Sequence, residues 1–454
     1  MMQTANTTAD ALLDAPRPSV WHTLSRILLL ALPFAVGAAA TSTLNLGKVA
    51  LLARVPDTGA LATLSLLQPS FILALAIMEG LAITAQVFSA RSRHNWPRRG
   101  TQRAVYRLCR NGVLLFAVVA ALGYAAAQML TVEDAKLRVI LDHFPLFMLS
   151  LVPFVVFDIF YGAMRGQGKV LLGLLPFMGL VALDLSTTYV LVSSYGWGFE
   201  AVLVGNLVGP VLMLPVIAWL LHREVRSGDD SPEEPFRIRM RQLQIGVGIP
   251  VFSSIVVGFV SASVVFPILA KIGEDSASAF FVVLRYRIAF MIPAIAIGSA
   301  IAILVNQLAE EGQTAQRLRY LVIGVPFMLS LYAAVTALLP QWSGALDLLV
   351  PTQAEALRQA TDEMFAALLV TFFLVSGSAM LQVILEQLGR GVQVLVITFL
   401  IEAGTCAGVV WAMMQGAEMG LILDILIAAA ALSFGLFAVQ FLLLLRKLGR
   451  ADAV

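Results

Sequence analysis

Ala31-Leu-Pro-Phe34 and Gly248-Ile-Pro-Val251 each open a long apolar stretch, and their prolines are 217 residues apart. Farther along, Arg165-Gly-Gln-Gly168-Lys169 aligns with Glu386-Gln-Leu-Gly389-Arg390 at a separation of 221 residues. Duplicated hydrophobic halves are typical of proteins that work by alternating access, in which one half moves against the other around a site between them. We therefore expect two similar bundles with a central cavity.

Composition places the chain in a lipid bilayer. Of its 454 residues, 59% are hydrophobic and 13% are charged, and the mean hydropathy is +0.88. Soluble domains carry roughly 25% charged residues, and apolar runs of about 20 residues are long enough to cross the bilayer as helices. The expected fold class is all-α, a polytopic membrane protein of twelve helices in two pseudo-symmetric six-helix bundles. The predicted spans are 26–53, 59–89, 105–129, 144–164, 170–194, 199–221, 243–270, 277–306, 319–340, 363–386, 392–415 and 419–445.

These spans divide the chain into five predicted segments. A cytoplasmic lead (1–25) precedes the N-terminal bundle (26–221), and a polar cytoplasmic linker (222–242) joins it to the C-terminal bundle (243–446). A cytoplasmic tail (447–454) ends the chain.

Basic residues are concentrated in one set of loops. By the positive-inside rule this places both termini in the cytoplasm, which requires an even number of spans. The expected location is the cytoplasmic (inner) membrane. The residues on that side are Arg91, Arg93, Arg98, Arg99, Arg103, Arg165, Lys169, Arg223, Arg226, Arg237, Arg239, Arg241, Arg317, Arg319, Arg390, Arg446, Lys447 and Arg450.

The sequence offers no catalytic or metal-binding pattern. Its two cysteines, Cys109 and Cys406, belong to no CxxC or metal-ligand spacing, and there is no phosphate-binding glycine loop. No hydrophilic segment is long enough to form a nucleotide-binding domain. We therefore expect a protein that is not an enzyme, has no cofactor or metal and binds no nucleic acid. Its energy source should be a gradient of H+ or Na+.

Five short motifs follow one another along the chain: Leu61-Ala-Thr-Leu-Ser-Leu-Leu-Gln-Pro69, Gly80-Leu-Ala-Ile-Thr-Ala-Gln86, Tyr161-Gly-Ala-Met-Arg-Gly-Gln-Gly168, Gly196-Trp-Gly-Phe-Glu-Ala201 and Leu284-Arg-Tyr-Arg-Ile-Ala-Phe-Met-Ile-Pro293. In this order they resemble the multidrug and toxic compound extrusion (MATE) family. That family belongs to the multidrug/oligosaccharidyl-lipid/polysaccharide flippase superfamily. The resemblance implies two six-helix bundles related by a pseudo-twofold axis along the membrane normal.

The chain departs from that family at its ion-coupling positions. Where members that exchange protons or sodium usually carry an acid in span one, this chain has Asn45 and Lys48. The family's acids of spans seven and ten fall near Gly258 and Gly377, and its glutamate of span eight falls near Arg287. The resemblance therefore implies the family's fold of two six-helix bundles, but not its ion-coupling residues.

Asp184 is the strongest candidate for ion coupling. A charge in the middle of a span costs at least about 2.5–3.5 kcal/mol on insertion scales, so it normally faces a partner or a wet cavity. Thr188 lies four residues on, on the same helical face. On span one, Thr41, Asn45 and Lys48 form a polar stripe, and we predict a Lys48–Asp184 ion pair. The alternatives are a structural carboxylate, and a lysine that extends to the headgroups.

Other intramembrane charges have weaker signals. Glu79 is a second candidate for ion coupling, by relaying protons or binding a cation, or else a structural group near the inner interface. Asp158 is expected to pair with a nearby arginine. Arg285 or Arg287 can pair with Glu402 on span eleven. If Arg287 faces the cavity instead, it favours an anionic group on the substrate.

The predicted function is secondary-active antiport. We expect export of amphipathic small molecules such as drugs, toxins or natural products by a monomer, with Asn45, Thr41, Thr188, Arg287 and Glu402 in the substrate cavity. One alternative is a flippase for a lipid-linked precursor, which would want a strongly cationic cavity and often extra spans. A membrane scaffold or enzyme would leave the duplicated halves unexplained.

Overall fold

A computed structural model describes residues 19–52, 60, 63–64, 66–92, 98–130, 135–225, 233–272, 274–308, 313–341, 355–416 and 418–451. Within these ranges the regular structure is helical and contains no strand. The all-α fold class is confirmed. The predicted N-terminal lead lies mostly outside the described residues.

Among the described residues, the first half forms seven helices and the second half forms nine helical segments, two of them short π-helices. The first-half helices are α2 (Val20–Leu52), α4 (Gln68–Arg91), α5 (Arg98–Met129), α6 (Ala135–Ser150), α7 (Val152–Gly166), α8 (Val170–Tyr195) and α9 (Phe199–Glu224). The second-half segments are α10 (Glu233–Leu243), η1 (Gln244–Gly248), α11 (Ile249–Ile272), α12 (Glu274–Gln307), α13 (Thr314–Leu338), α14 (Glu355–Leu385), η3 (Glu386–Arg390), α15 (Gly391–Met414) and α16 (Met419–Ala451).

The helices agree with twelve membrane crossings. Ten helical stretches in the described part of the chain are long and apolar enough to span a bilayer, and the bent pair α6–α7 makes eleven. One of the ten, Leu357–Met414, contains both α14 and α15, so it accounts for two crossings.

Two predicted segments differ from the structure. Span four (144–164) consists of α6 and α7, which are bent by 41° at Leu151. Pro153 is the second residue of α7, where its missing N–H costs nothing to the new helix but prevents α6 from continuing straight. The predicted linker is partly helical, because α10 runs through it and buries Phe236 and Met240 in the first-half core.

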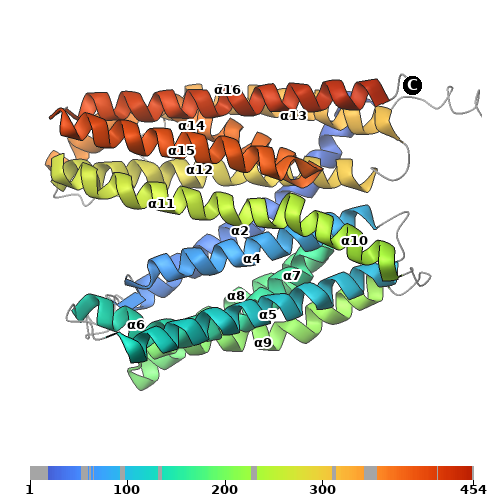
Figure 1. Cartoon of the computed structure of the whole chain (residues 1–454), viewed down its shortest axis with the longest axis horizontal. Helices are drawn as coiled ribbons and strands as arrows, with labels where there is room; N and C mark the ends of the chain where they lie inside the picture. Colours follow the sequence, from blue (N-terminus) through green and yellow to red (C-terminus); the bar gives the residue numbers. More distant parts are fainter. Residues whose placement is uncertain are drawn as a thin grey trace, which may run out of the picture.

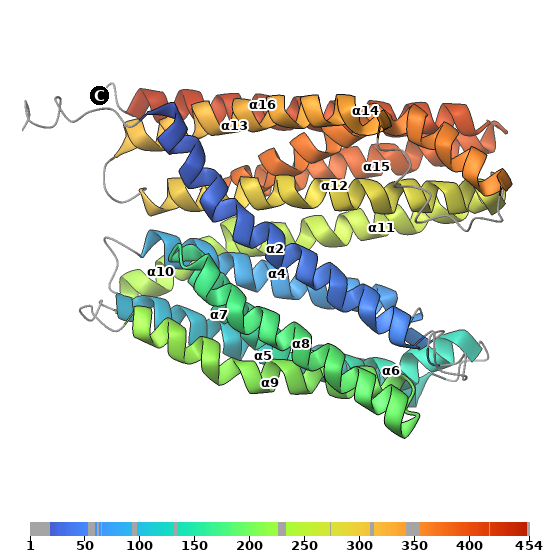
Figure 2. The same ribbon diagram turned by 180° about the vertical axis from the view of Figure 1, so that it is seen from behind.

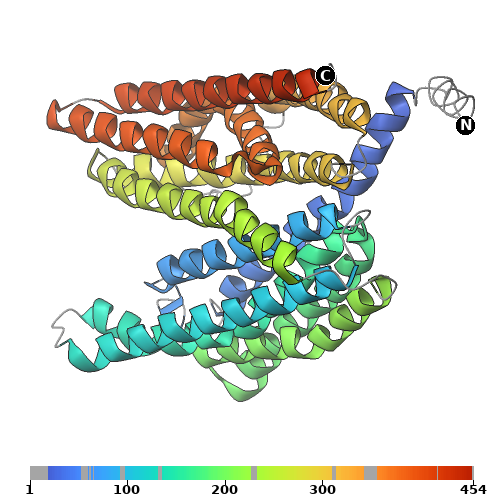
Figure 3. The ribbon, with the colours of Figure 1, turned by 45° about the vertical axis from the view of Figure 1, so that its right-hand side comes forward.

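Two helices cross from one half to the other. The first part of α2 packs in the second-half core through Ile27 and Ala31, while its last part contacts α8. Conversely, Val247 of η1 and Val251 of α11 belong to the first-half core, and the rest of α11 packs on α15. Figures 1 and 2 show α2 running diagonally between the two layers of helices, and Figure 3 shows α11 doing so on the other side.

Most of the described arginine-bearing helix ends gather at one end of the bundle, which we call the basic end; the starts of α6 (Arg138) and α14 (Arg358) lie at the other. The start of α2, the end of α4, helix α10, η3 and the end of α16 all lie there (Figure 1). The side-chain hydrogen bonds that join the two halves also lie there. Gln86 Nε2 donates to Gln387 Oε1 at 2.9 Å, and Gln307 Nε2 donates to the Gly166 carbonyl at 2.9 Å. The 221-residue repeat relates Gln86 to Gln307 and Gly166 to Gln387, so these two bonds are pseudo-symmetric.

Helices α4 and α7 approach at backbone distance. A Cβ added at Gly162 would collide with the Ala82 carbonyl oxygen, and one at Gly166 would collide with the Gln86 carbonyl oxygen. Small residues four apart let two membrane helices come this close, which increases their van der Waals contact. This pairing holds Gln86 and Gly166 in place for the bonds between the halves.

We expect Gly162→Ala to lower the thermal unfolding temperature of the detergent-purified protein, because the methyl group meets backbone atoms. Overpacking of this kind costs about 1–3 kcal/mol. Gly435→Ala in α16 is the matched control, since a Cβ there meets nothing within 4 Å. Equal unfolding temperatures for the two variants would contradict the close approach.

Candidate functional site

The predicted Lys48–Asp184 ion pair is present. Lys48 Nζ on α2 lies 2.7 Å from Asp184 Oδ2 on α8 and 2.6 Å from Asn206 Oδ1 on α9. Lys48 is 7% exposed and Asp184 is 1% exposed. The ammonium group is therefore held inside the first half, and the alternative in which Lys48 extends to the headgroups is wrong.

Further hydrogen bonds extend the cluster. Thr188 Oγ1 donates to Asp184 Oδ1 at 3.4 Å, so both carboxylate oxygens have partners. Asn206 Nδ2 donates to Ser150 Oγ at 3.0 Å, and Ser150 Oγ donates to the Phe147 carbonyl at 2.7 Å. Four helices (α2, α6, α8 and α9) thus contribute to one buried polar network, as burial of charged groups requires.

Two glycines on α9 make room for the carboxylate. A Cβ at Gly205 would collide with Thr188 Oγ1 and Asp184 Oδ1, and a Cβ at Gly209 would lie 2.7 Å from the Leu180 carbonyl oxygen. Gly205-Asn-Leu-Val-Gly209 has the GxxxG spacing of closely packed membrane helices. Because α9 packs closely against α8 at these two glycines, Asn206 reaches the same ammonium group as Asp184.

Asn206 and Ser150 are the residues that sequence reasoning missed. A signal for Asn206 existed, because it is the one amide between Glu200 and His222 in an otherwise apolar span flanked by the two glycines. No comparable signal marked Ser150, since serine is common in membrane helices and lies here one residue before the α6–α7 bend.

The cluster has the composition of a monovalent cation site. The Asp184 carboxylate and the Asn206 amide oxygen contact one positive charge, the Lys48 ammonium group, and the Thr188 hydroxyl bonds to the carboxylate. A buried pair of this kind is costly to break, since removing one partner strands the other charge. In this structure Asp184 holds the tethered ammonium group of Lys48.

The rest of the predicted stripe on α2 does not join the cluster. Thr41 Oγ1 donates to the Gly37 carbonyl of its own helix at 3.1 Å, and Asn45 is exposed. Their assignment to the substrate cavity stays a prediction. Val265, the repeat counterpart of Lys48, is a buried apolar residue, so the second half carries no matching ammonium at this position.

Glu79 lies in a different group, at the junction of the two halves. It is close enough to Asp158 on α7 and Glu386 on η3 to act on both electrostatically. Asp158 Oδ1 is 3.9 Å from Arg165 Nη2, which confirms the predicted arginine partner. The Arg165 guanidinium also lies 4.9 Å from the Tyr161 ring centroid. Glu79 is thus separate from the Lys48–Asp184 cluster.

In the second half, Arg287 and Glu402 are neighbours with different direct partners. Arg287 Nη1 donates to Thr371 Oγ1 at 3.1 Å, and Ser261 is the hydrogen-bonding partner of Glu402. Glu402 still acts on Arg287 electrostatically. The side chain of Arg285 lies outside the described residues. The cavity role of Arg287 and Glu402 stays a prediction.

No protein-family model and no curated protein sequence matches the chain. Solved structures do match it. A MOP superfamily transporter from Pyrococcus furiosus has a TM-score of 0.81 at 13% identity, covering 94% of this chain and 97% of its own. The description of that structure says that the reverse polarity of its binding pocket suggests a different function.

Two MATE structures are similarly close. A mutant of a MATE transporter from Vibrio cholerae has a TM-score of 0.82 at 13% identity, covering 94% of this chain and 98% of its own. An outward-facing multidrug resistance transporter of the MATE family has a TM-score of 0.78 at 15% identity, covering 92% and 96%. The chain therefore has the MATE transporter fold, that of a multi-pass membrane protein.

We expect Lys48→Met and Asp184→Asn each to lower the free energy of unfolding by about 3–5 kcal/mol, because each leaves one buried charge unpaired. The double variant should lose less than the sum of the two. Thermal unfolding of the purified variants measures this coupling. The exposed pair Arg138–Asp142 is the control, for which coupling should stay below about 0.5 kcal/mol. Additive losses at Lys48 and Asp184 would contradict the pair.

Proposed function

We propose that the protein is a secondary-active antiporter that exports amphipathic small molecules, driven by an inward gradient of H+ or Na+. The observation that carries the proposal is the buried Lys48–Asp184–Asn206 cluster, in which Lys48 comes from the helix α2 that crosses between the halves. The MATE fold supports the transporter class, and its solved members include a multidrug resistance transporter.

The position of α2 suggests how the cluster takes part in transport. Its first part is packed among second-half helices, and its last part carries Lys48 to α8. A movement of one half against the other therefore pulls α2 away from one of its two partners. In our proposal this movement withdraws Lys48 from Asp184, and the vacated carboxylate takes up a proton or Na+.

We further propose that the basic end faces the cytoplasm, in the cytoplasmic (inner) membrane. The arginine-bearing loops support this orientation by the positive-inside rule. Bonds Gln86–Gln387 and Gln307–Gly166 then close the bundle on the cytoplasmic side. We propose the monomer as the working unit, since each chain holds both halves.

The flippase alternative receives less support from the described residues. It calls for a strongly cationic cavity, but Lys48 is neutralised by Asp184 and Arg165 faces Asp158. Arg287, beside Glu402, is the intramembrane cation that best supports an anionic substrate. A fluorescent amphipathic anion should therefore be tested beside a fluorescent amphipathic cation.

The test is transport in proteoliposomes under an imposed proton or sodium gradient, with ethidium as the cationic probe. We expect Asp184→Asn to slow gradient-driven transport at least tenfold, because the ion then has no carboxylate to bind. Asp142→Asn, at an exposed acid on α6, should transport like the wild type. Wild-type rates in Asp184→Asn would remove this residue from coupling. If neither probe is transported by the wild type under either gradient, antiport of these amphipathic substrates is wrong.

The variant Lys48→Ala tests whether the ion-pair partner of Asp184 takes part in coupling. Protonation of Asp184 would no longer compete with a fixed ammonium group, so the pH dependence of transport should shift by at least half a pH unit. The measurement is the initial rate between pH 5 and 9 with the gradient held constant. An unchanged profile in a folded variant would show that the pair is structural.

A further inference from the structure

The repeated motif of the sequence lies at the seam, which is the contact between the two halves at the basic end. Its first copy, Arg165-Gly-Gln-Gly168-Lys169, joins α7 to α8, and its second copy, Glu386-Gln-Leu-Gly389-Arg390, is η3, between α14 and α15. Both copies contain a glycine with a left-handed backbone, with φ 76° at Gly168 and 86° at Gly389, a conformation that glycine adopts without strain. Each copy thus turns the chain from one helix into the next, and each is bonded to the opposite half.

Gln387 of η3 forms hydrogen bonds in three directions. Its Oε1 accepts from Gln86 Nε2 at 2.9 Å, its Nε2 donates to Ser299 Oγ at 3.1 Å, and its backbone carbonyl accepts from Asn306 Nδ2 at 3.1 Å. Ser299 and Asn306 are on α12 of the second half, whereas Gln86 is on α4 of the first. Asn306 Oδ1 in turn accepts from Arg91 Nε of α4 at 3.0 Å. Gln387 is therefore held by its own half and reaches across the seam.

The first copy of the motif is bonded differently. Gly166 stands where the second copy has Gln387, and it offers its backbone carbonyl to Gln307 Nε2. The next residue, Gln167, bonds inside the first half, with Nε2 donating to the Ser89 carbonyl at 3.1 Å and to Ser89 Oγ at 3.0 Å. Gly166 is also packed against the backbone of α4. The first copy is thus a fixed part of its half.

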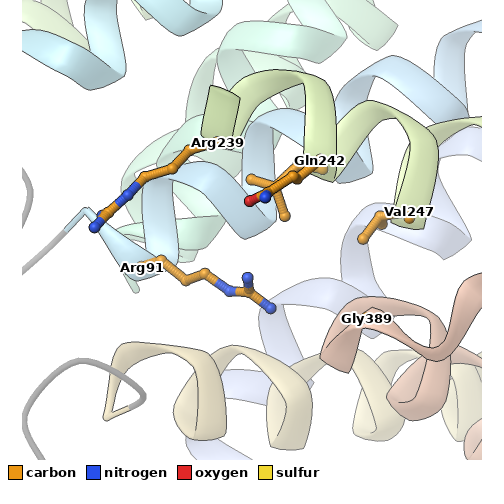
Figure 4. Close-up of a pocket in the computed structure, with 7 residues that line it drawn as sticks. Arg91, Arg239, Gln242, Val247 and Gly389 are labelled. Atoms are coloured by element: carbon orange, nitrogen blue, oxygen red, sulfur yellow. The ribbon is translucent and has the colours of Figure 1, made fainter. Parts of the chain in front are cut away.

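An open pocket adjoins η3 at the seam. It has a cavity volume of about 290 Å³, and Figure 4 shows it between the end of α4, helix α10 with η1, and η3 at Gly389. A Cβ added at Gly389, or at Gly246 of η1, would meet nothing within 4 Å. Gly389 is two residues from Gln387, so solvent that enters the pocket comes close to the bond across the seam. Amide groups that separate there are rehydrated at once, which keeps the cost of breaking the bond small.

We propose that η3 is a latch: the bonds from Gln86 to Gln387 and from Gln307 to Gly166 hold the basic end closed, and their release lets the two halves part there. Gln387 positions the latch, since its two bonds to α12 direct its Oε1 at the first half. A neutral bond of this kind shifts an equilibrium by about two- to tenfold, so the latch sets the resting proportion of closed molecules. The inference rests on the alternating access of the proposed function, but on neither the exported molecule nor the coupling ion.

The experiment measures the distance between two spin labels, by double electron–electron resonance, in the detergent-purified full-length protein. The labels are attached after Arg223→Cys, at the end of α9, and Gln393→Cys, at the start of α15, two exposed positions at the basic end. The native cysteines are removed in every sample by Cys109→Ala and Cys406→Ala. The proportion of molecules at the longer distance then reports how often the basic end is open.

We expect the double variant Gln86→Leu, Gln307→Leu to raise this proportion at least fivefold over the wild type, because both latch bonds are lost. Gln86→Asn should raise it about two- to tenfold, since it keeps an amide but is one methylene too short to reach Gln387. Gln167→Leu is the matched control. It removes a buried amide of the same motif that bonds inside the first half, so it should leave the distances unchanged even where it lowers the unfolding temperature.

An unchanged distance distribution in either folded latch variant would overturn the latch, as would an equal shift in Gln167→Leu. Gln86→Asn decides the question if the double variant does not fold. The distances require no substrate and no gradient, so this result is separate from the transport assay. If the latch variants shift the distances while the wild type transports neither probe, the latch stands and antiport of those probes is wrong.

Discussion

A lysine ammonium and an aspartate carboxylate remain charged below the headgroups only when each satisfies the other, because desolvation of either alone costs several kcal/mol. Lys48 and Asp184 meet this condition at 2.7 Å, with Asn206 accepting a second bond from the ammonium group and Thr188 donating to the other carboxylate oxygen. The rest of the first half is arranged around this requirement. Helix α9 approaches α8 through Gly205 and places its one mid-span amide beside the pair.

Helix α2 contacts both halves of the protein. Its first part belongs to the core of the second half, and its last part delivers Lys48 to the first. The crossing of α11 in the opposite direction is the pseudo-symmetric counterpart, but Val265 stands where Lys48 would be. The arrangement of the helices is thus nearly symmetric between the halves, whereas the charged residues are not. Under the proposed mechanism, ion coupling is concentrated in the first half, and the second half is free to vary with the substrate.

Closure at the basic end has a different physical basis. It depends on amides and backbone carbonyls, with Gln86 and Gln307 donating across the seam. Neutral hydrogen bonds of this kind are worth about 0.5–1.5 kcal/mol each, so they can form and break in each cycle. Ion pairs buried at the same place would be harder to separate.

The number and order of the spans and the all-α class followed from hydropathy, because a bilayer admits few alternatives to apolar helices, and the duplication followed from the repeated motifs. The Lys48–Asp184 pair also followed from the sequence, since two opposite charges at mid-span have few other ways to be neutralised. Asn206 and Ser150 did not, because uncharged polar residues tolerate many surroundings in a membrane. The crossing of α2 and α11, the bend at Leu151 and the amide contacts at the seam were decided by tertiary packing. These features depend on how helices distant in sequence are rotated and shifted against one another. Glycines such as Gly162 and Gly205 fix the relative position of two helices, because each allows a close contact with a residue of the neighbouring helix.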